Sequence, residues 1–344
     1  MKKKLESVFP YISSEVLERE LECARFVKYT ERGENKIYVF SGRDCPYLML
    51  QIGILREVSF RNGGGGTGLA IDVDCWDEFS TEHISADAVD LEYLNLLGPF
   101  LSNGFKQLII WDPENKEIIG GYRYAEMSLL LNEDMNMINS PSMELFDCSL
   151  RFFRAYAPYT IELGRSFVQP KYQLRGDDIP PRKAMYALDN LFEGLGTLVV
   201  DHKIQYFFGK VTMYKTYNRQ ARNMILYYME KNFPDYDQLV YPKTEFIPPG
   251  LKDEIDLLET IFIGNSERED KKILKKSLRK ITQGIPPLFD KYTEMSPTMK
   301  VFGTAINYHC GEVEETSILI KIEDIVEKYK KNYILNYLHK NLCL

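Results

Sequence analysis

The hydrophobic and polar positions of the chain repeat with two different periods, which predicts both helices and strands. Apolar residues three to four positions apart predict a helix that begins near Ser13 and contains Leu17 and Leu21. Continuous or periodic apolar character predicts further helices over residues 47–60, 182–200 and 217–232. Runs rich in β-branched and aromatic residues predict strands over residues 36–40, 105–111, 118–124, 160–168 and 204–213. Because strands and helices alternate here, we expect a mixed sheet with helices packed against it.

A change in composition near residue 245 divides the chain. Four residues interrupt the pattern there, Pro242, Pro248, Pro249 and Gly250. Beyond them we expect helices over residues 253–263 and 267–281, strands over 300–306 and 317–322, and a terminal helix over 323–342. The predicted division is an N-terminal helical segment (1–35), a core (36–245) and a C-terminal extension that is helical with a strand pair (246–344). The expected fold class is α+β in three layers (α/β/α), with a mixed central sheet between flanking helices.

Composition and charge narrow the function. The chain has 344 residues, with 43 Lys and Arg against 50 Asp and Glu and a net charge of −7. This balance argues against nucleic acid as a partner, because such binding depends on basic side chains. The six cysteines form no C-x-x-C pair and the four histidines have no metal-binding spacing, so no metal site is expected and a reducing cytoplasm fits best. With no convincing export signal and no apolar run near the ~18 residues that span a bilayer, we expect a soluble protein, or at most one bound peripherally to the inner face of a membrane.

A run of glycines, Gly63 to Gly66, invites comparison with nucleotide-binding loops. Gly63, Gly65 and Gly68 match the spacing G-x-G-x-x-G, but extended residues follow them instead of the helix that would bind a pyrophosphate. No lysine follows the glycines, so a P-loop is excluded as well. We interpret the segment as a flexible loop.

Two charged residues, Glu162 and Arg165, interrupt the apolar strand predicted over residues 160–168. Regular alternation places Glu162 and Gly164 on one face of the sheet and Leu163 and Arg165 on the other, unless a bulge redirects them. One interpretation is an internal ion pair, in which Arg123 or Asp74 supplies a partner. The other is a carboxylate in a cleft that acts as a general base, with arginines available to bind an anion.

Four segments, taken in order, resemble the motifs of the GNAT acyltransferase superfamily. Arg56 to Phe60 resembles an R-x-x-x-F segment, Asp74 to Asp77 a D-x-aromatic-D segment followed by His83, Gly120 to Arg123 a G-x-Y-R strand, and Glu162 to Val168 an E-x-G-R-S-x-V strand. Within the superfamily, the chain resembles the ornithine-lipid and glycine-lipid N-acyltransferases, which are often labelled hemolysin-like. It is distantly similar to acyl-homoserine lactone synthases. The resemblance covers roughly residues 40–330 and continues into Ile285 to Leu288 and Tyr292.

This resemblance implies an activity and a set of site residues. The activity is transfer of a fatty or 3-hydroxy fatty acyl chain from a thioester to the α-amine of an amino acid such as ornithine or glycine, in the synthesis of amino-acid-containing lipids. The implied catalytic residues are Glu162, as the base, and Arg165. The implied substrate-binding residues are Arg56, Phe60, Asp74, Asp77, His83 and Arg123, and the implied oxyanion and donor-binding residues are Gly164, Ser166, Phe167 and Val168. Arg123 and Arg165 either bind a carboxylate or a carrier phosphate, or orient Glu162 and Asp74.

The region after Val168 departs from the superfamily pattern. The R/Q-x-x-G-x-G/A loop that binds the pyrophosphate of acetyl-CoA is not recognisable there. This favours a long acyl chain on acyl carrier protein as the donor, with acyl-CoA as the alternative. The donor is a substrate, and no bound cofactor is expected. In the extension, Asn307 stands near a position where an aspartate is common in the family.

Residues 271–280 place six basic side chains in ten, above apolar residues that share one helical face. Such a helix either presents a solvated face above a packed stripe, or docks an acidic carrier protein or anionic lipid. Two other functions stay open, an enzyme like the acyl-homoserine lactone synthases and a non-catalytic lipid- or partner-binding protein on the same scaffold. A pore-forming protein is not expected, because the chain has no amphipathic membrane-spanning pattern.

Overall fold

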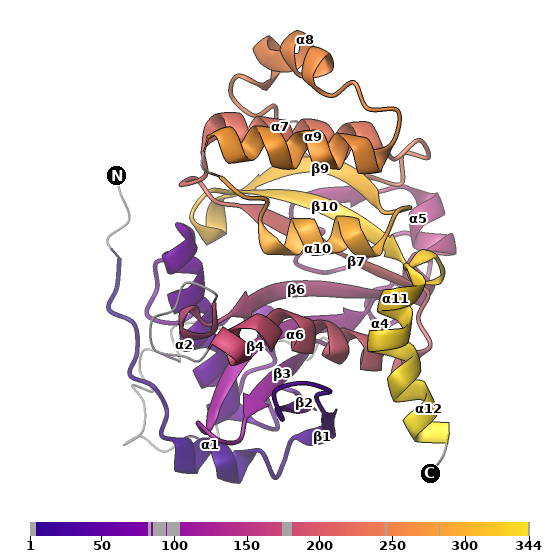
Figure 1. The fold of residues 1–344 in the computed structure, drawn as a ribbon. Coiled ribbons are helices and arrows are strands. Elements are labelled where there is room, and N and C mark those ends of the chain that lie inside the picture. The colour runs from indigo at the N-terminus through magenta and orange to yellow at the C-terminus, as the bar shows by residue number, and fades with distance from the viewer. Residues whose placement is uncertain are drawn as a thin grey trace.

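The computed structural model describes residues 5–81, 84, 94, 104–173, 181–244, 246–281 and 283–342. In this part of the chain, eight strands form one sheet in the order β1–β2–β3–β4–β6–β7–β10–β9 (Figure 1). They are β1 (Arg25–Tyr29), β2 (Lys36–Phe40), β3 (Lys106–Asp112), β4 (Glu117–Glu126), β6 (Thr160–Val168), β7 (Tyr206–Met213), β9 (Lys300–Asn307) and β10 (Val313–Lys321). β5 (Phe146–Cys148) and β8 (Val240–Pro242) form a separate antiparallel pair. The large sheet is mixed, because β6 and β7 are parallel while the other neighbours are antiparallel.

Helices cover both faces of this sheet, which confirms the three-layer α+β fold (Figure 1). On one face, here called the α6 face, one apolar cluster joins the sheet to α6 (Pro181–His202), α7 (Arg219–Asn232), α9 (Glu267–Lys280) and α10 (Pro287–Met295). The opposite face, the α2 face, carries α1 (Ser14–Glu20) and α2 (Pro46–Gly63). It also carries α4 (Met127–Leu130) and α5 (Leu150–Ala155), which pack with β5 and β8 against β7, β9 and β10. The remaining helices are α8 (Leu251–Ile261), α11 (Glu327–Tyr329) and α12 (Asn336–Leu342).

The helix α2 confirms the prediction over residues 47–60. Pro46 stands in its first turn, where a missing N–H is tolerated, and Gly64 ends it with a φ of 96°. Every residue from 48 to 57 is buried. A helix enclosed by protein on all sides needs no polar face, which explains why the apolar run is continuous.

A bulge in β6 changes the direction of its side chains. Ile161 and Leu163 pack in the cluster of the α6 face, as alternation predicts. At Arg165, however, φ is 49° and the register between β4 and β6 shifts. Arg165 therefore joins Gly164 on the α2 face, where it contacts Asp74. The sequence allowed for a bulge that would redirect these side chains, and the structure contains one.

Some elements differ from the predicted ones. β10 begins at Val313, earlier than expected, because Glu314 and Glu315 concealed the start of the strand. The predicted terminal helix begins only at Glu327 and contains a π-helical turn, η6 (Lys330–Leu335). α10 was missed because the pair Pro286 and Pro287 suggested a break, whereas Pro287 stands in the first turn of the helix.

The C-terminal extension contributes to the central sheet. β10 pairs with β7 along its whole length, from Glu314 opposite Met213 to Lys321 opposite Tyr206. The division of the chain at residue 245 stays a prediction. Within the described ranges, every helix is too short or too polar to cross a membrane.

Candidate active site

β6 and β7 lie side by side at one end and separate at the other. Their parallel pairing joins residues 160–163 to residues 206–209. It then ends, although β6 continues to Val168 and β7 to Met213. The bulge at Arg165 lies just beyond the last pair, and bulges increase the local twist of a strand. The separation therefore follows from the local structure of β6.

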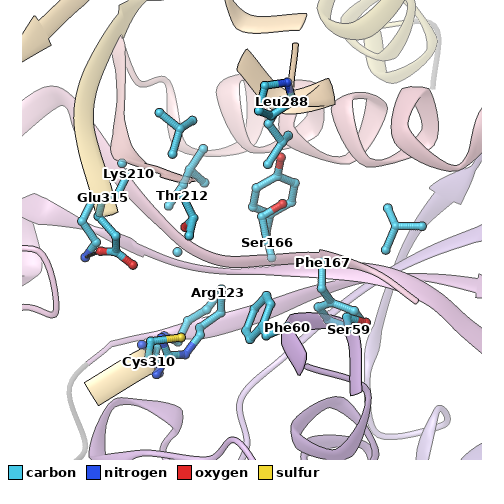
Figure 2. Close-up of a pocket in the computed structure, with 18 of the residues that line it drawn as sticks. Ser59, Phe60, Arg123, Ser166, Phe167, Lys210, Thr212, Leu288, Cys310 and Glu315 are labelled. Atoms are coloured by element: carbon cyan, nitrogen blue, oxygen red, sulfur yellow. Dashed lines mark ion pairs between the residues drawn. The ribbon is translucent and has the colours of Figure 1, made fainter. Parts of the chain in front are cut away.

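A cavity of about 1250 Å³ lies where the two strands separate. It is lined from both faces of the sheet, and Figure 2 shows Leu288 on one side of the strand and Arg123 and Phe60 on the other. Ligand pockets in proteins typically measure roughly 300–1,000 Å³. The cavity therefore accommodates a ligand much larger than an amino acid, and it joins two compartments of different chemistry.

On the α2 face, three arginines and three aspartates form a chain of ion pairs, the arginine–aspartate network (Arg56, Arg123, Arg165, Asp72, Asp74 and Asp77). Arg165 lies 3.2 Å from Asp72 (Nε to Oδ2) and 3.1 Å from Asp74 (Nη2 to Oδ2). Arg123 pairs with Asp74 and lies 3.1 Å from Asp77 (Nη1 to Oδ1). Arg56 donates to Asp77 over 2.9 Å, and both of these side chains are completely buried. Each charge in the network thus has an opposite charge beside it.

The loop that carries these aspartates is fixed by hydrogen bonds of its own. At η1 (Cys75–Asp77), Asp74 Oδ1 accepts from the N–H of Trp76, and Asp77 Oδ2 accepts from the N–H of Asp74, each over 3.0 Å. Gln107 of β3 donates to Asp77 over 3.0 Å and accepts from Arg56 over 2.6 Å. Such reciprocal capping fixes the turn, so the carboxylates are held in place before any ligand arrives.

Burial and the arginines act in opposite directions on the carboxylates of the network. Burial alone would raise the pKa of Asp74, but Arg123 and Arg165 hold that pKa well below its usual range. At Asp72 burial prevails and raises the pKa, although Arg165 and Arg56 oppose it. The 3.2 Å contact of Asp72 with Arg165 is an ion pair without hydrogen-bond geometry, and neither oxygen of Asp72 has a hydrogen-bond partner among the described residues.

Glu162 lies on the same face, lines the cavity and is only 2% exposed. Its Oε1 accepts a hydrogen bond from the backbone N–H of Ser142 over 3.0 Å. Its Oε2 is buried and has no hydrogen-bond partner within the described part of the chain. Leaving a buried polar atom unpaired costs about 1–3 kcal/mol. This oxygen is therefore available to a donor that enters the cavity.

Across the separation, β7 and β10 add two more charged side chains. Lys210 Nζ donates to the carbonyl of Pro141 and to Ser142 Oγ, each over 3.2 Å. It lies 3.6 Å from Glu315 Oε2, which has no hydrogen-bond partner among the described residues. Glu315 Oε1 accepts from Asn307 Nδ2 over 3.2 Å. We call these side chains the Glu162–Lys210–Glu315 cluster; Figure 2 shows Lys210 beside Glu315.

The compartment on the α6 face is mainly apolar. Its lining comes from β6, β7, β10, α6 and α10 and includes Leu163, Val211, Ile318, Leu188, Leu288 and Phe289. Among these side chains, the hydroxyls of Tyr122 and Tyr292 lie 3.3 Å apart. Burial raises the pKa of Tyr122, while hydrogen bonds with Ser166 and Tyr292 partly oppose the shift. The compartment thus suits a long apolar ligand and has a small polar group close to the sheet.

Comparison with known proteins gives two close relatives. A glycine N(alpha)-acyltransferase of Phocaeicola vulgatus is 39% identical over 338 residues, which are 98% of this chain and 95% of that protein. A glycine N(alpha)-acyltransferase of Bacteroides thetaiotaomicron is 40% identical over 338 residues, 98% of this chain and 92% of that protein. The chain belongs to the glycine N(alpha)-acyltransferase family. No family model and no solved structure matches it.

Membership of the glycine N(alpha)-acyltransferase family establishes an enzyme of the acyltransferase class. The predicted amide-forming acyltransferase is thereby confirmed, and the non-catalytic alternative is not supported. The two faces of the cavity fit such an enzyme, since N-acylation brings a polar amine and an acyl group together.

In this member of the glycine N(alpha)-acyltransferase family, the structure brings most of the predicted site residues to the cavity. Those that line it are Phe60, Asp74, Arg123, Glu162, Gly164, Arg165, Ser166, Phe167 and Val168. Within the described residues, Arg56 and Asp77 do not line it; they lie behind Arg123, so their contacts favour support of Arg123 over direct binding. His83 lies outside the described residues. The roles assigned to all these residues stay predictions.

Sequence reasoning missed Lys210 and Glu315. Lys210 is a charged residue within a mainly apolar strand, which is the same signal that singled out Glu162, whereas Glu315 stands in the polar first half of β10. It also missed that residues of the C-terminal extension, among them Leu288 and Tyr292, form a wall of the cavity. That wall follows from the pairing of β10 with β7, which no local pattern reveals.

Proposed function

We propose that the protein transfers a fatty or 3-hydroxy fatty acyl chain from an acyl carrier protein thioester to the α-amine of glycine, in the synthesis of amino-acid-containing lipids. Acyl-CoA is the alternative donor and ornithine the alternative acceptor. Glycine is favoured because both relatives are named for it. The proposal includes a place in the GNAT superfamily, within its lipid N-acyltransferase branch, and rests there on the four motifs in the sequence.

The observation that carries the proposal is the state of Glu162. Its carboxylate is held at one oxygen by Ser142, unpaired at the other, and placed on the wall of the cavity. An α-ammonium group has a pKa of about 8 in peptide-like models and must lose a proton before it attacks a thioester. A base positioned for that step contributes roughly a hundred- to ten-thousand-fold in rate. Glu162 therefore serves as the general base.

The proposed reaction forms one amide bond and breaks one thioester bond. The ammonium group gives one proton to Glu162, which later releases it to solvent. The neutral nitrogen attacks the carbonyl carbon, a C–N bond forms, and the C–S bond breaks. The second proton of the amine leaves the tetrahedral intermediate and ends on the thiolate. The developing oxyanion lies near the edge of β6 that no longer pairs with β7 beyond Leu163, where backbone N–H groups that face β7 would stabilise it.

The apolar compartment supports a long-chain donor. A chain that enters from the separation of β6 and β7 passes between Leu163 of β6 and Leu288 of α10, both of which line the cavity. The hydroxyls of Tyr122 and Tyr292, close to the sheet, supply hydrogen bonds to an oxygen near the thioester end of the chain. A 3-hydroxy group is such an oxygen.

The contacts of Arg123 and Arg165 favour one of the alternatives left open by the sequence. Both guanidinium groups form ion pairs with two aspartates each, although the Nε atom of each has no hydrogen-bond partner among the described residues. They therefore shape the polar compartment and fix Asp74 at its wall, instead of standing free to bind a carboxylate or a phosphate.

The basic helix α9 supports docking of an acidic carrier protein. Two of its six cations are engaged inside the chain, since Lys271 and Lys275 each lie 3.0 Å from Asp290 of α10. The other four, Lys272, Lys276, Arg279 and Lys280, are exposed. The helix ends at Lys280, and Gln283 and Gly284 already line the cavity. The exposed cations thus lie next to the route by which a carrier-bound chain would enter.

The test uses purified protein with a long-chain acyl carrier protein and glycine, and detects the N-acyl product by mass spectrometry. Wild type forms acylglycine, whereas Glu162→Gln loses roughly 100- to 10,000-fold in rate. The matched control is Glu259→Gln, an exposed acid of α8 that keeps wild-type activity. Wild-type rates in Glu162→Gln would contradict the base assignment, and no acylation of any amino acid by wild type would contradict the function.

A further inference from the structure

Lys210 differs from the other cations of the cavity in its contacts. Among the described residues that line the cavity, the Arg and Lys side chains are those of Arg123, Arg165 and Lys210. Both arginines lie within 3.2 Å of aspartates. Among the described residues, the closest carboxylate to Lys210 is that of Glu315, at 3.6 Å, which is beyond hydrogen-bond distance.

One N–H donor of the Lys210 ammonium group has no hydrogen-bond partner among the described residues. An ammonium group has three N–H donors. Two are used by Pro141 and Ser142, and within the described residues no acceptor lies at bonding distance for the third. Its side chain is only 13% exposed and lines the cavity, so a ligand in the cavity is placed to accept from this donor.

Lys210 and Glu162 are attached to the same short segment. Ser142 donates its N–H to Glu162 and accepts from Lys210 at its hydroxyl. A carboxylate with a free oxygen and an ammonium group with a free donor thus stand on neighbouring strands at the separation of the sheet. An α-amino acid carries the complementary pair, an amine and a carboxylate on one carbon.

We propose that Lys210 binds the carboxylate of the acceptor amino acid and so directs its amine towards Glu162. This rests on the proposed function and adds to it the residue that reads the acceptor. Arg123 and Arg165 are less suited to the task, because each has two aspartates within 3.2 Å, whereas Lys210 has one carboxylate at 3.6 Å among the described residues. Glu315, held by Asn307, balances the charge of Lys210 when no acceptor is bound. Amines without a carboxylate are therefore poor acceptors.

The test compares glycine with glycinamide, which has the amine but no carboxylate, in wild type and in Lys210→Met. The expected result is a loss of roughly 10- to 100-fold in kcat/KM for glycine, because one charge-assisted hydrogen bond is removed. The kcat/KM for glycinamide changes less than about 2-fold on the same grounds, since glycinamide never formed that bond. Lys210→Arg restores most of the preference for glycine.

The matched control is Lys215→Met, which removes a half-exposed lysine that pairs with Glu312 and does not line the described cavity. It keeps both rates. Equal losses for glycine and glycinamide in Lys210→Met would assign Lys210 a structural role and overturn the proposal, as would unchanged rates. If wild type acylates glycine but Lys210→Met gives either of these results, the proposed function stands while the proposed role of Lys210 is wrong. If wild type acylates neither amine nor any other amino acid, the proposed function fails and Lys210 with it.

Discussion

The α2 face of the sheet holds two charged clusters that differ in how their charges are paired. In the arginine–aspartate network, three positive and three negative side chains alternate, and the deepest pair is completely buried. In the Glu162–Lys210–Glu315 cluster, there is one cation for two carboxylates, and each carboxylate keeps one oxygen without a hydrogen bond in the described part of the chain.

We interpret this difference as a division between structural support and catalysis. A buried ion pair with both partners present mainly holds a structure in one arrangement, and removing one partner is costly. A buried carboxylate that has an unpaired oxygen and no described cation within 3.5 Å is already unfavourable, so it gains when a substrate donor arrives. The network is therefore expected to govern stability, and the cluster is expected to govern turnover.

The largest expected effect comes from breaking the network at its buried end. Asp77→Asn leaves Arg56 and Arg123 without their shared carboxylate. We expect the free energy of unfolding to fall by about 3–5 kcal/mol, measured by denaturant titration. Asp237→Asn, which removes a partly exposed partner of Arg151 and Lys300, should have a far smaller effect, because exposed ion pairs contribute little. A loss that small for Asp77→Asn would contradict the supporting role of the network.

The next effect comes from closing the passage between the two compartments. A Cβ atom added at Gly164 would meet nothing within 4 Å, so a side chain there projects into the cavity. We expect Gly164→Leu to fold with wild-type stability and to lose roughly 100-fold in acyl transfer, because it displaces the reacting groups. Gly164→Ala should lose much less. A fully active Gly164→Leu enzyme would show that acyl transfer takes place elsewhere.

Acid titration sharpens the comparison within the network. The pKa of Asp74 is lowered in the folded protein from 3.8, so its contribution to stability is present above 3.8 and is lost as the pH falls from there through the lowered pKa. The pKa of Asp72 is raised from 3.8, so its contribution is present at low pH and is lost as the pH rises above that value. Asp74→Asn should therefore flatten the loss of stability in acid, and Asp72→Asn should remove an opposing loss at higher pH. Unfolding curves at successive pH values measure both, and the same change in both variants would contradict the assignment.

The smallest effect is expected on the surface, away from both clusters. Reversal of the four exposed cations of α9, at Lys272, Lys276, Arg279 and Lys280, should raise the KM for a carrier-bound donor by roughly 10-fold and leave the KM for acyl-CoA unchanged, because surface charge mainly steers docking. The measurement is steady-state kinetics with both donors at two salt concentrations. Unchanged kinetics with lost liposome binding would assign the helix to a lipid surface instead.

Much of the fold could be predicted from the sequence, because local patterns determine it. β2 and β6 have the predicted bounds, and β3 and β4 form the predicted hairpin. Site residues could be predicted where a charged residue interrupts an apolar strand, as at Glu162. Local patterns could not predict which residues meet in three dimensions. Arg165 reaches Asp72 and Asp74 only because β6 has a bulge. Lys210 lies near Glu315, which belongs to a strand about a hundred positions later in the chain.

The strand that carries Glu315 into the site follows the other described strands of the sheet along the chain. Proteins emerge from the ribosome N-terminus first, and β10 (Val313–Lys321) follows almost everything else. Until it pairs with β7, the cavity has no Glu315, and Lys210 has no partner across the sheet. A nascent chain in which β10 has not yet paired with β7 therefore lacks one of the charged side chains that line the cavity.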